Sequence, residues 1–112
     1  MLQNREVIYF LAEKDKEIIG LATGRVREDG VGMLGFLGVK NERREEGVGA
    51  DLLNRFLEEA KKRNAHKVWL LTSPNLHSAM RIYVKRGFVP EGCMRRYSHG
   101  LDLIIYSKFL NE

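Results

Sequence analysis

A helix with one apolar face, placed between two β-favouring segments, constrains the fold of this chain most. From Val48 onward, apolar and charged residues alternate at helical spacing: Val48, Leu52, Leu53, Phe56, Leu57 and Ala60 against Asp51, Arg55, Glu58, Glu59 and Lys62. The segment Met33 to Val39 precedes this helix, Lys67 to Thr72 follows it, and both have strand character. Strand, helix and strand in this order predict a βαβ unit with a right-handed crossover.

The segments on either side predict antiparallel arms. Val7 to Leu11 and Glu17 to Val26 predict a hairpin, and the turn residues Glu28-Asp29-Gly30 lead into the strand that ends at Val39. Gly92 to Tyr97 and Leu101 to Phe109 predict a second hairpin at the end of the chain. The order β-β-β-α-β-α-β-β predicts an α/β fold with a mixed sheet and two main helices.

The second helix is predicted over Leu76 to Arg86, where apolar residues again recur at helical spacing. Asn75 is a plausible N-cap, and Gly87 is a plausible left-handed residue after the last turn. The strand before this helix has four consecutive apolar residues from Val68 to Leu71, which is typical of a strand buried on both faces.

Glycines interrupt the strand that precedes the first helix. Gly35 and Gly38 weaken a plain strand, but they would tolerate a bulge or the close approach of another backbone. A simple packing role for either glycine remains an alternative.

Composition limits the class of protein. The 112 residues, 44% of them hydrophobic and 30% charged, suit one folded domain over residues 1–112 in the cytoplasm, without a signal peptide or a transmembrane segment. Cys93 is the only cysteine, so no internal disulfide can form, and no metal site is expected. The net charge of +4 suits a polyanion, either nucleic acid or a phosphorylated cofactor.

A loop with two glycines leads into the first helix, where residues 43–54 read RREEGVGADLLN. Glycine is a poor residue with which to begin a helix interior, so helix stability does not explain Gly47 and Gly49. Such a loop exposes backbone N–H groups at the positive end of the helix dipole, which suits a phosphate, and Arg43 or Arg44 could add a charged contact. Because the loop matches neither a Walker A nor a dinucleotide motif, an ordinary helix start remains the alternative.

The loop and the second helix together resemble two signatures of the GNAT superfamily of N-acetyltransferases. The acyl-CoA pyrophosphate signature R/Q-x-x-G-x-G/A is matched by Arg44, Gly47 and Gly49. The second signature, an Asn, an Ala four residues later, a Tyr eight residues later and then Gly-Phe, is matched by Asn75, Ala79, Tyr83, Gly87 and Phe88. The resemblance covers roughly residues 18–110, most of the chain.

The resemblance implies a splayed, V-shaped sheet that holds acetyl-CoA as co-substrate between the strands Met33 to Val39 and Lys67 to Thr72. The pantetheine arm would pair with main-chain groups of Leu37 and Val39. Asn75 would contact the same arm, cap its helix, or do both. The pyrophosphate would lie on main-chain N–H groups of the loop, among them those of Arg44, Gly47, Val48, Gly49 and Ala50.

Tyr83 is the catalytic residue that the resemblance implies, as the proton donor to the departing CoA thiolate. A phenol suits this role because its ordinary pKa of about 10 keeps it protonated at neutral pH. The alternative is that Tyr83 is an aromatic residue on the core face of its helix. The general base stays open, because the strand Val31 to Leu37 contains no Glu, Asp or His. The candidates are a relay of waters or Glu28, Asp29, Glu91 and His99.

The N-terminal part departs from the family pattern. The family usually begins with a strand and two helices that form much of the acceptor site, whereas this chain enters at the second strand of that pattern. We expect the sheet edge and apolar surface left uncovered to pair with a second copy in a homodimer.

The resemblance implies an acetyl-CoA-dependent N-acetyltransferase that moves the acetyl group directly to an amine, in a small molecule or a peptide. Two alternatives stay open. One is a catalytically idle acyl-CoA-binding or regulatory protein. The other is a nucleic-acid-binding module using Arg95-Arg96-Tyr97 and Lys61-Lys62-Arg63, although few aromatic residues suited to base stacking accompany them. We expect neither a nucleic acid nor a membrane as partner.

Overall fold

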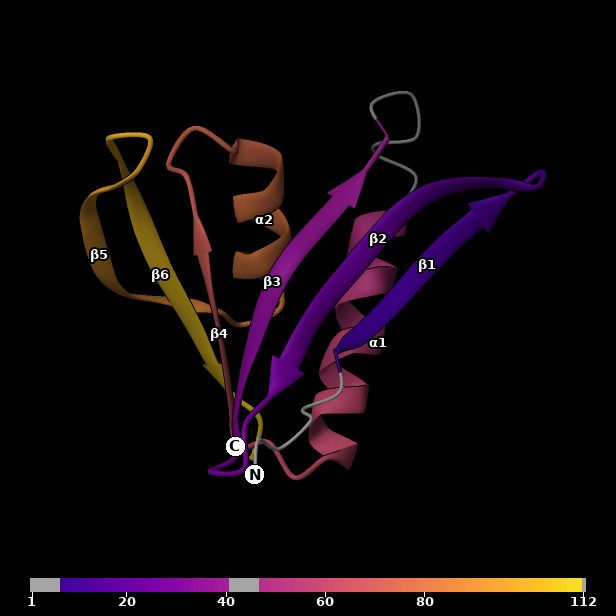
Figure 1. Cartoon of the computed structure of the whole chain (residues 1–112), viewed down its shortest axis with the longest axis horizontal. Helices are drawn as coiled ribbons and strands as arrows, with labels where there is room; N and C mark the ends of the chain where they lie inside the picture. The colour runs from indigo at the N-terminus through magenta and orange to yellow at the C-terminus, as the bar shows by residue number, and fades with distance from the viewer. Residues whose placement is uncertain (1–6, 41–46, 112) are drawn as a thin grey trace, which may run out of the picture.

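Six strands and two helices follow one another in the predicted order (Figure 1). The computed structural model describes residues 7–40 and 47–111. The elements are β1 (Ile8–Lys14), β2 (Glu17–Val26), β3 (Val31–Val39), α1 (Val48–Lys62), β4 (Lys67–Thr72), α2 (His77–Lys85), β5 (Val89–Ser98) and β6 (Leu101–Phe109). The strands form one sheet in the order β1-β2-β3-β4-β6-β5.

The sheet is splayed where β3 meets β4, its one parallel strand pair in the described part of the chain. The two strands pair only from Val31 opposite Lys67 to Met33 opposite Trp69. Beyond that point they diverge, so that β3 and β4 form the arms of a V (Figure 1). The predicted fold class, a splayed mixed sheet around a central βαβ unit, is therefore confirmed.

Both helices pack on the same face of the sheet, which we call the covered face. The apolar stripe of α1 buries Leu53 and Phe56 completely against strand residues such as Ala22. Figure 1 shows α1 behind β1 and β2, and the helix also contacts β3. Farther along the sheet, α2 places the ring of Tyr83 6.5 Å from that of Tyr106 on β6. Burial of a side chain such as that of Phe56 stabilises the fold by about 1.5–3 kcal/mol.

The prediction that β4 is buried on both faces was wrong. Val68, Leu70 and Thr72 are buried on the covered face, whereas Trp69 and Leu71 are only half-buried on the opposite face. The reason is that α1 and α2 cover the same side of the sheet. Four consecutive apolar residues in β4 therefore leave two apolar side chains that packing against the helices does not explain.

The prediction that Asn75 caps α2 was also wrong. The main-chain N–H of Leu76 donates a hydrogen bond to Ser73 O at 3.0 Å, which closes a turn with Pro74 and Asn75 at its centre. Leu76 is the N-cap residue, and the first helical bond runs from Met80 N–H to Leu76 O at 3.0 Å. The turn occupies Asn75, so the helix begins at His77.

Two glycine predictions are confirmed. In β3, Phe36 lies opposite Thr23 and Leu34 lies opposite Gly24, which leaves Gly35 as the extra residue of a bulge. Gly87 has a φ of 88° and ends α2, with Phe88 N–H donating to Tyr83 O at 3.0 Å. Neither helix of the described segments has the length and apolar character that crossing a lipid bilayer requires.

Candidate functional site

The first turn of α1 offers main-chain donors to open space. Gly47, the N-cap residue, has a φ of 81°, and a Cβ added there would meet no atom of residues 7–40 or 48–111 within 4 Å. Within the described residues, no side chain caps this end. The N–H groups of Val48, Gly49 and Ala50 have no acceptor in the preceding turn of the helix, and the helix dipole makes this end positive. Arg44, predicted to add a charged contact, lies outside the described residues.

Gly49 has a packing role that sequence reasoning missed. A Cβ added to this buried residue would lie 3.0 Å from Ile82 Cδ1 and 3.6 Å from Val39 Cγ2. The glycine thus lets the start of α1 approach both α2 and the end of β3. The only sequence feature that could have indicated this contact is the partner residue Ile82, which stands next to Tyr83 in the second helix.

The end of β3 directs main-chain groups toward the split between β3 and β4. Lys40 N–H donates to Ile19 O on β2 at 2.8 Å. Because alternate residues of a strand direct their N–H and C=O groups to opposite sides, those of Leu37 and Val39 point away from β2. The structure therefore brings these two residues and the α1 N-terminus together at the predicted ligand site.

Tyr83 lies in α2 with its ring in the core. The residue is 6% exposed, and its ring centroid is 5.8 Å from that of Phe88. Burial raises the pKa of Tyr83 to about 12. No buried polar side-chain atom of the described residues lacks a hydrogen-bond partner, and the Tyr83 hydroxyl makes no such bond, so its oxygen reaches solvent. The hydroxyl is a proton donor that stays protonated far above neutral pH.

Asn75 lies at the end of the split, in the turn after β4, with its side chain exposed. Its main-chain N–H lies 3.3 Å from Ser73 Oγ. Since β3 and β4 are parallel, the turn that holds Asn75 and the end of β3 at Val39 lie at the same end of the sheet.

Three of the candidate general bases, Glu28, Asp29 and Glu91, lie toward the closed end of the split, where β3 and β4 still pair. Glu91 Oε1 lies 2.8 Å from Lys67 Nζ at the start of β4, and hydrogen bonds from Lys67 and then Ser107 lower the pKa of this carboxyl. Asp29, in the β2–β3 turn, pairs with Arg27 at 2.6 Å. Neighbouring Glu28 is in the same turn, and His99 is in the β5–β6 turn, where its Nδ1 lies 3.2 Å from Ser98 Oγ.

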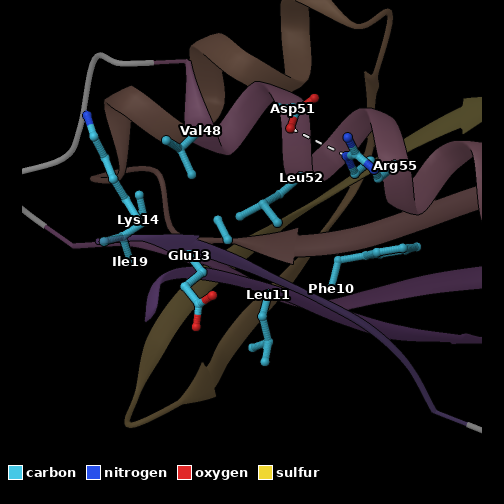
Figure 2. A pocket seen from close by; sticks show the side chains of 10 residues that line it. Phe10, Leu11, Glu13, Lys14, Ile19, Val48, Asp51, Leu52 and Arg55 are labelled. Atoms are coloured by element: carbon cyan, nitrogen blue, oxygen red, sulfur yellow. Dashed lines mark hydrogen bonds and ion pairs between the residues drawn. The ribbon is translucent and has the colours of Figure 1, made fainter. Parts of the chain in front are cut away.

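A separate pocket of about 460 Å³ opens between β1 and α1 (Figure 2). Its floor includes Phe10 and Leu52, and its rim carries Asp51 and Arg55, whose side chains form an ion pair at 3.4 Å. The pocket is lined by β1, β2 and α1 and by no residue of β4 or α2. It is therefore distinct from the split, where the predicted site residues meet.

Known proteins share both sequence and fold with this chain. A Bacillus subtilis protein with the provisional name [ribosomal protein bS18]-alanine N-acetyltransferase is 26% identical over 114 residues, which are 100% of this chain and 75% of that protein. The ribosomal-protein-S18-alanine N-acetyltransferase from Escherichia coli superposes with a TM-score of 0.84 at 23% identity, over 96% of this chain and 72% of the other.

A third relative was solved with a ligand. A Bacillus anthracis protein with the provisional name streptothricin acetyltransferase, in complex with acetyl coenzyme A, gives a TM-score of 0.83 at 22% identity, over 96% of this chain and 64% of the other. The two superpositions show the acyl-CoA N-acyltransferase fold. Residues 1–88 match the Acetyltransferase (GNAT) family. The chain therefore belongs to the GNAT family of acetyltransferases.

Proposed function

We propose that the protein transfers the acetyl group of acetyl-CoA directly to an amine. The observation that carries this proposal is the divergence of β3 from β4 beside the first turn of α1. The split offers main-chain groups of a strand, and the helix start offers main-chain donors at Gly47, Val48, Gly49 and Ala50 that no side chain of the described residues caps. An extended chain that ends in a pyrophosphate fits these two features, because it needs β-type pairing along its arm and N–H donors at its anionic end.

The residues predicted to bind acetyl-CoA would contact two parts of it, the pantetheine arm and the pyrophosphate. The main chain of Leu37 and Val39 would pair with the pantetheine arm, and Asn75 would bond the same arm from the β4 side. The α1 N-terminus and Arg44 would hold the pyrophosphate. When bound, acetyl-CoA supplies an activated acyl group.

Tyr83 would protonate the leaving group. In the transfer, the amine nitrogen forms a bond to the acetyl carbon, the C–S bond breaks, and the sulfur takes the proton of the Tyr83 hydroxyl. The amine loses a proton to water, and water reprotonates Tyr83. Because its pKa is about 12, the Tyr83 hydroxyl is protonated throughout the neutral pH range.

Two further features belong to this proposal. The relatives' names give different acceptors, alanine of a ribosomal protein and streptothricin, so the acceptor of this chain has to be argued from its own residues. We also propose that the protein works in the cytoplasm on a small-molecule or peptide amine, without a nucleic acid, a membrane or a metal ion as partner.

Binding and thiol release test the function together. We expect acetyl-CoA to raise the melting temperature, free thiol to appear with an amine acceptor, and random oligonucleotides to have no effect. The Tyr83→Phe variant should lose turnover far more than acetyl-CoA affinity, and equal losses in both would contradict the proton-donor role. Binding of acetyl-CoA without release of free thiol in the presence of any amine would favour the alternative of a catalytically idle acyl-CoA-binding protein. This alternative stays open because the described residues place no carboxylate at the open end of the split.

We further propose that two copies associate through β1, one of the two outer strands of the described sheet. The pocket beside β1 has an apolar floor, and its rim pair Asp51 and Arg55 is self-complementary under a two-fold axis, because each residue can face the other in a second copy. Leu11 is exposed and points away from α1 (Figure 2).

The oligomeric state tests this association. Light scattering should give a dimer mass, and the Leu11→Glu variant should give monomer. The matched control is Val84→Glu on α2, also an exposed apolar residue. A wild-type monomer at all concentrations would contradict the dimer without affecting the proposed reaction.

A further inference from the structure

The side of the sheet opposite the covered face is apolar at the mouth of the split. We call Met33, Phe36, Trp69 and Leu71 the acceptor floor. Met33 and Trp69 form the last pair that β3 and β4 share. Phe36 and Leu71 lie farther along the diverging strands. The cross-strand pairing puts Met33 and Trp69 on one face, and alternation puts Leu71 there too.

Packing does not account for these side chains. Met33 is 36% exposed and Phe36 is 52% exposed, whereas Trp69 and Leu71 are half-buried. On the covered face, α1 and α2 close the sheet, so an acceptor that reaches the split must approach from the side of the acceptor floor. The four apolar residues are therefore placed where an acceptor would make its first contacts beyond the reacting amine.

The charges around the acceptor floor disfavour a cationic acceptor. Arg25 lies opposite Met33 on β2, and its side chain has no ion pair among the described residues. The carboxylate of Glu91 forms an ion pair with Lys67, two residues before Trp69 on β4, at 2.8 Å. A polyamine or a lysine-rich segment would meet the unpaired guanidinium, and the printed contacts of residues 7–40 and 47–111 place no carboxylate beside it to compensate.

We propose that the acceptor floor selects an α-amine whose own side chain is uncharged and apolar, such as the first residue of a peptide, and disfavours lysine side chains and polyamines. This inference rests on the proposed function. An α-amine has a pKa near 8 and is substantially neutral without help, whereas a lysine amine near 10.4 needs a base. The split supplies no such base within the described residues, which agrees with an acceptor that needs none.

A panel of amines tests the acceptor class in the wild-type protein. Uncharged pentapeptides that begin with Gly, Ala or Leu are compared with Nα-acetyl-lysine amide and with spermidine, through free thiol release at saturating acetyl-CoA. We expect kcat/KM for the Leu-first peptide to exceed that for spermidine by at least about tenfold. A higher kcat/KM for spermidine or for the lysine derivative would overturn the inference while leaving the acetyl transfer intact. Failure of acetyl-CoA to bind would instead overturn the proposed function.

Variants then test the residues. Met33→Ala should raise KM for the Leu-first peptide about fivefold and leave KM for the Gly-first peptide and the affinity for acetyl-CoA unchanged. The matched control is Ile18→Ala at the far end of β2, an exposed residue at 51%. Arg25→Glu should raise kcat/KM for spermidine about tenfold by replacing repulsion with attraction. Equal effects of Met33→Ala and Ile18→Ala, or an unchanged KM for the Leu-first peptide, would contradict the role of the acceptor floor.

Discussion

Arg86 Nε donates a hydrogen bond of 2.7 Å to Asn54 Oδ1, and this bond ties the end of α2 to the middle of α1. The bond is partly buried, so loss of either partner leaves a polar group without compensation. We expect Asn54→Ala to lower the free energy of unfolding by about 1–2 kcal/mol in urea titrations.

The double-mutant cycle with Arg86→Ala checks this bond. The two losses should be clearly non-additive, because both changes remove the same interaction. Arg27→Ala breaks only the exposed pair with Asp29 and should cost less than about 0.5 kcal/mol. Additive losses would contradict the bond as a source of stability.

Tyr83 should make the stability fall in strongly alkaline solution. Its pKa is about 12 in the folded protein and about 10 when exposed, so between these values the folded state keeps a proton that the unfolded state has released. Unfolding is then favoured as the pH rises from 10 to 12, by about 2–3 kcal/mol at the upper end. Tyr83→Phe should lack this component, and identical pH dependences of the two proteins would refute it.

Gly49 should tolerate larger side chains only when Ile82 is shortened. A Cβ at position 49 would lie 3.0 Å from Ile82 Cδ1, so Gly49→Val should destabilise the fold by about 2 kcal/mol through overpacking. The second change Ile82→Ala should recover part of that loss in thermal unfolding. By contrast, Gly47→Ala meets open space and should cost about 1 kcal/mol, from its left-handed backbone alone.

Glu91 should contribute to stability and not to proton abstraction. The carboxyl has a lowered pKa because Lys67 and Ser107 bond to its charged form, so its stabilising effect is present above the ordinary pKa of a glutamate and is lost as the pH falls through the lowered value. The stability difference between wild type and Glu91→Gln should therefore shrink on acidification from pH 7 to pH 3. The pH profile of kcat/KM should stay unchanged, and loss of its acidic limb in the variant would identify Glu91 as a base.

The sequence predicted most of this fold because its strongest signals are local. The bounds of β2, β4 and β6 and the start of α1 were all predicted, since apolar periodicity and turn residues mark them. Asn75 failed as a cap because a turn that begins with Ser73 and Pro74 competes for the same residue. The strand β5 begins three residues before the predicted Gly92, since the Lys67 and Glu91 pairing at its start is non-local.

The candidate site was predictable only where its residues carry recognisable side chains. Gly47 and Tyr83 could be selected from their match to the two family signatures, whereas the directions of the Leu37 and Val39 main-chain groups depend on pairing with β2. The half-exposed state of Trp69 depends on both helices packing on one face. The residue types of β4 do not indicate whether the helices cover one face of the sheet or both, because four consecutive apolar residues are compatible with either arrangement.

The three-residue pairing of β3 with β4 also has a mechanical consequence. Nearly all interstrand hydrogen bonds of the sheet lie within two groups of strands, β1-β2-β3 and β4-β6-β5, which we call the two plates. The chain crosses from the first plate to the second once, through α1. The angle between the plates can therefore change at the short seam that ends at Met33 and Trp69 while the ladders on both sides stay intact. An occupant of the V would work as a spacer that sets this angle, against the short seam and against the one core that joins Leu34 on β3 to Leu70 on β4.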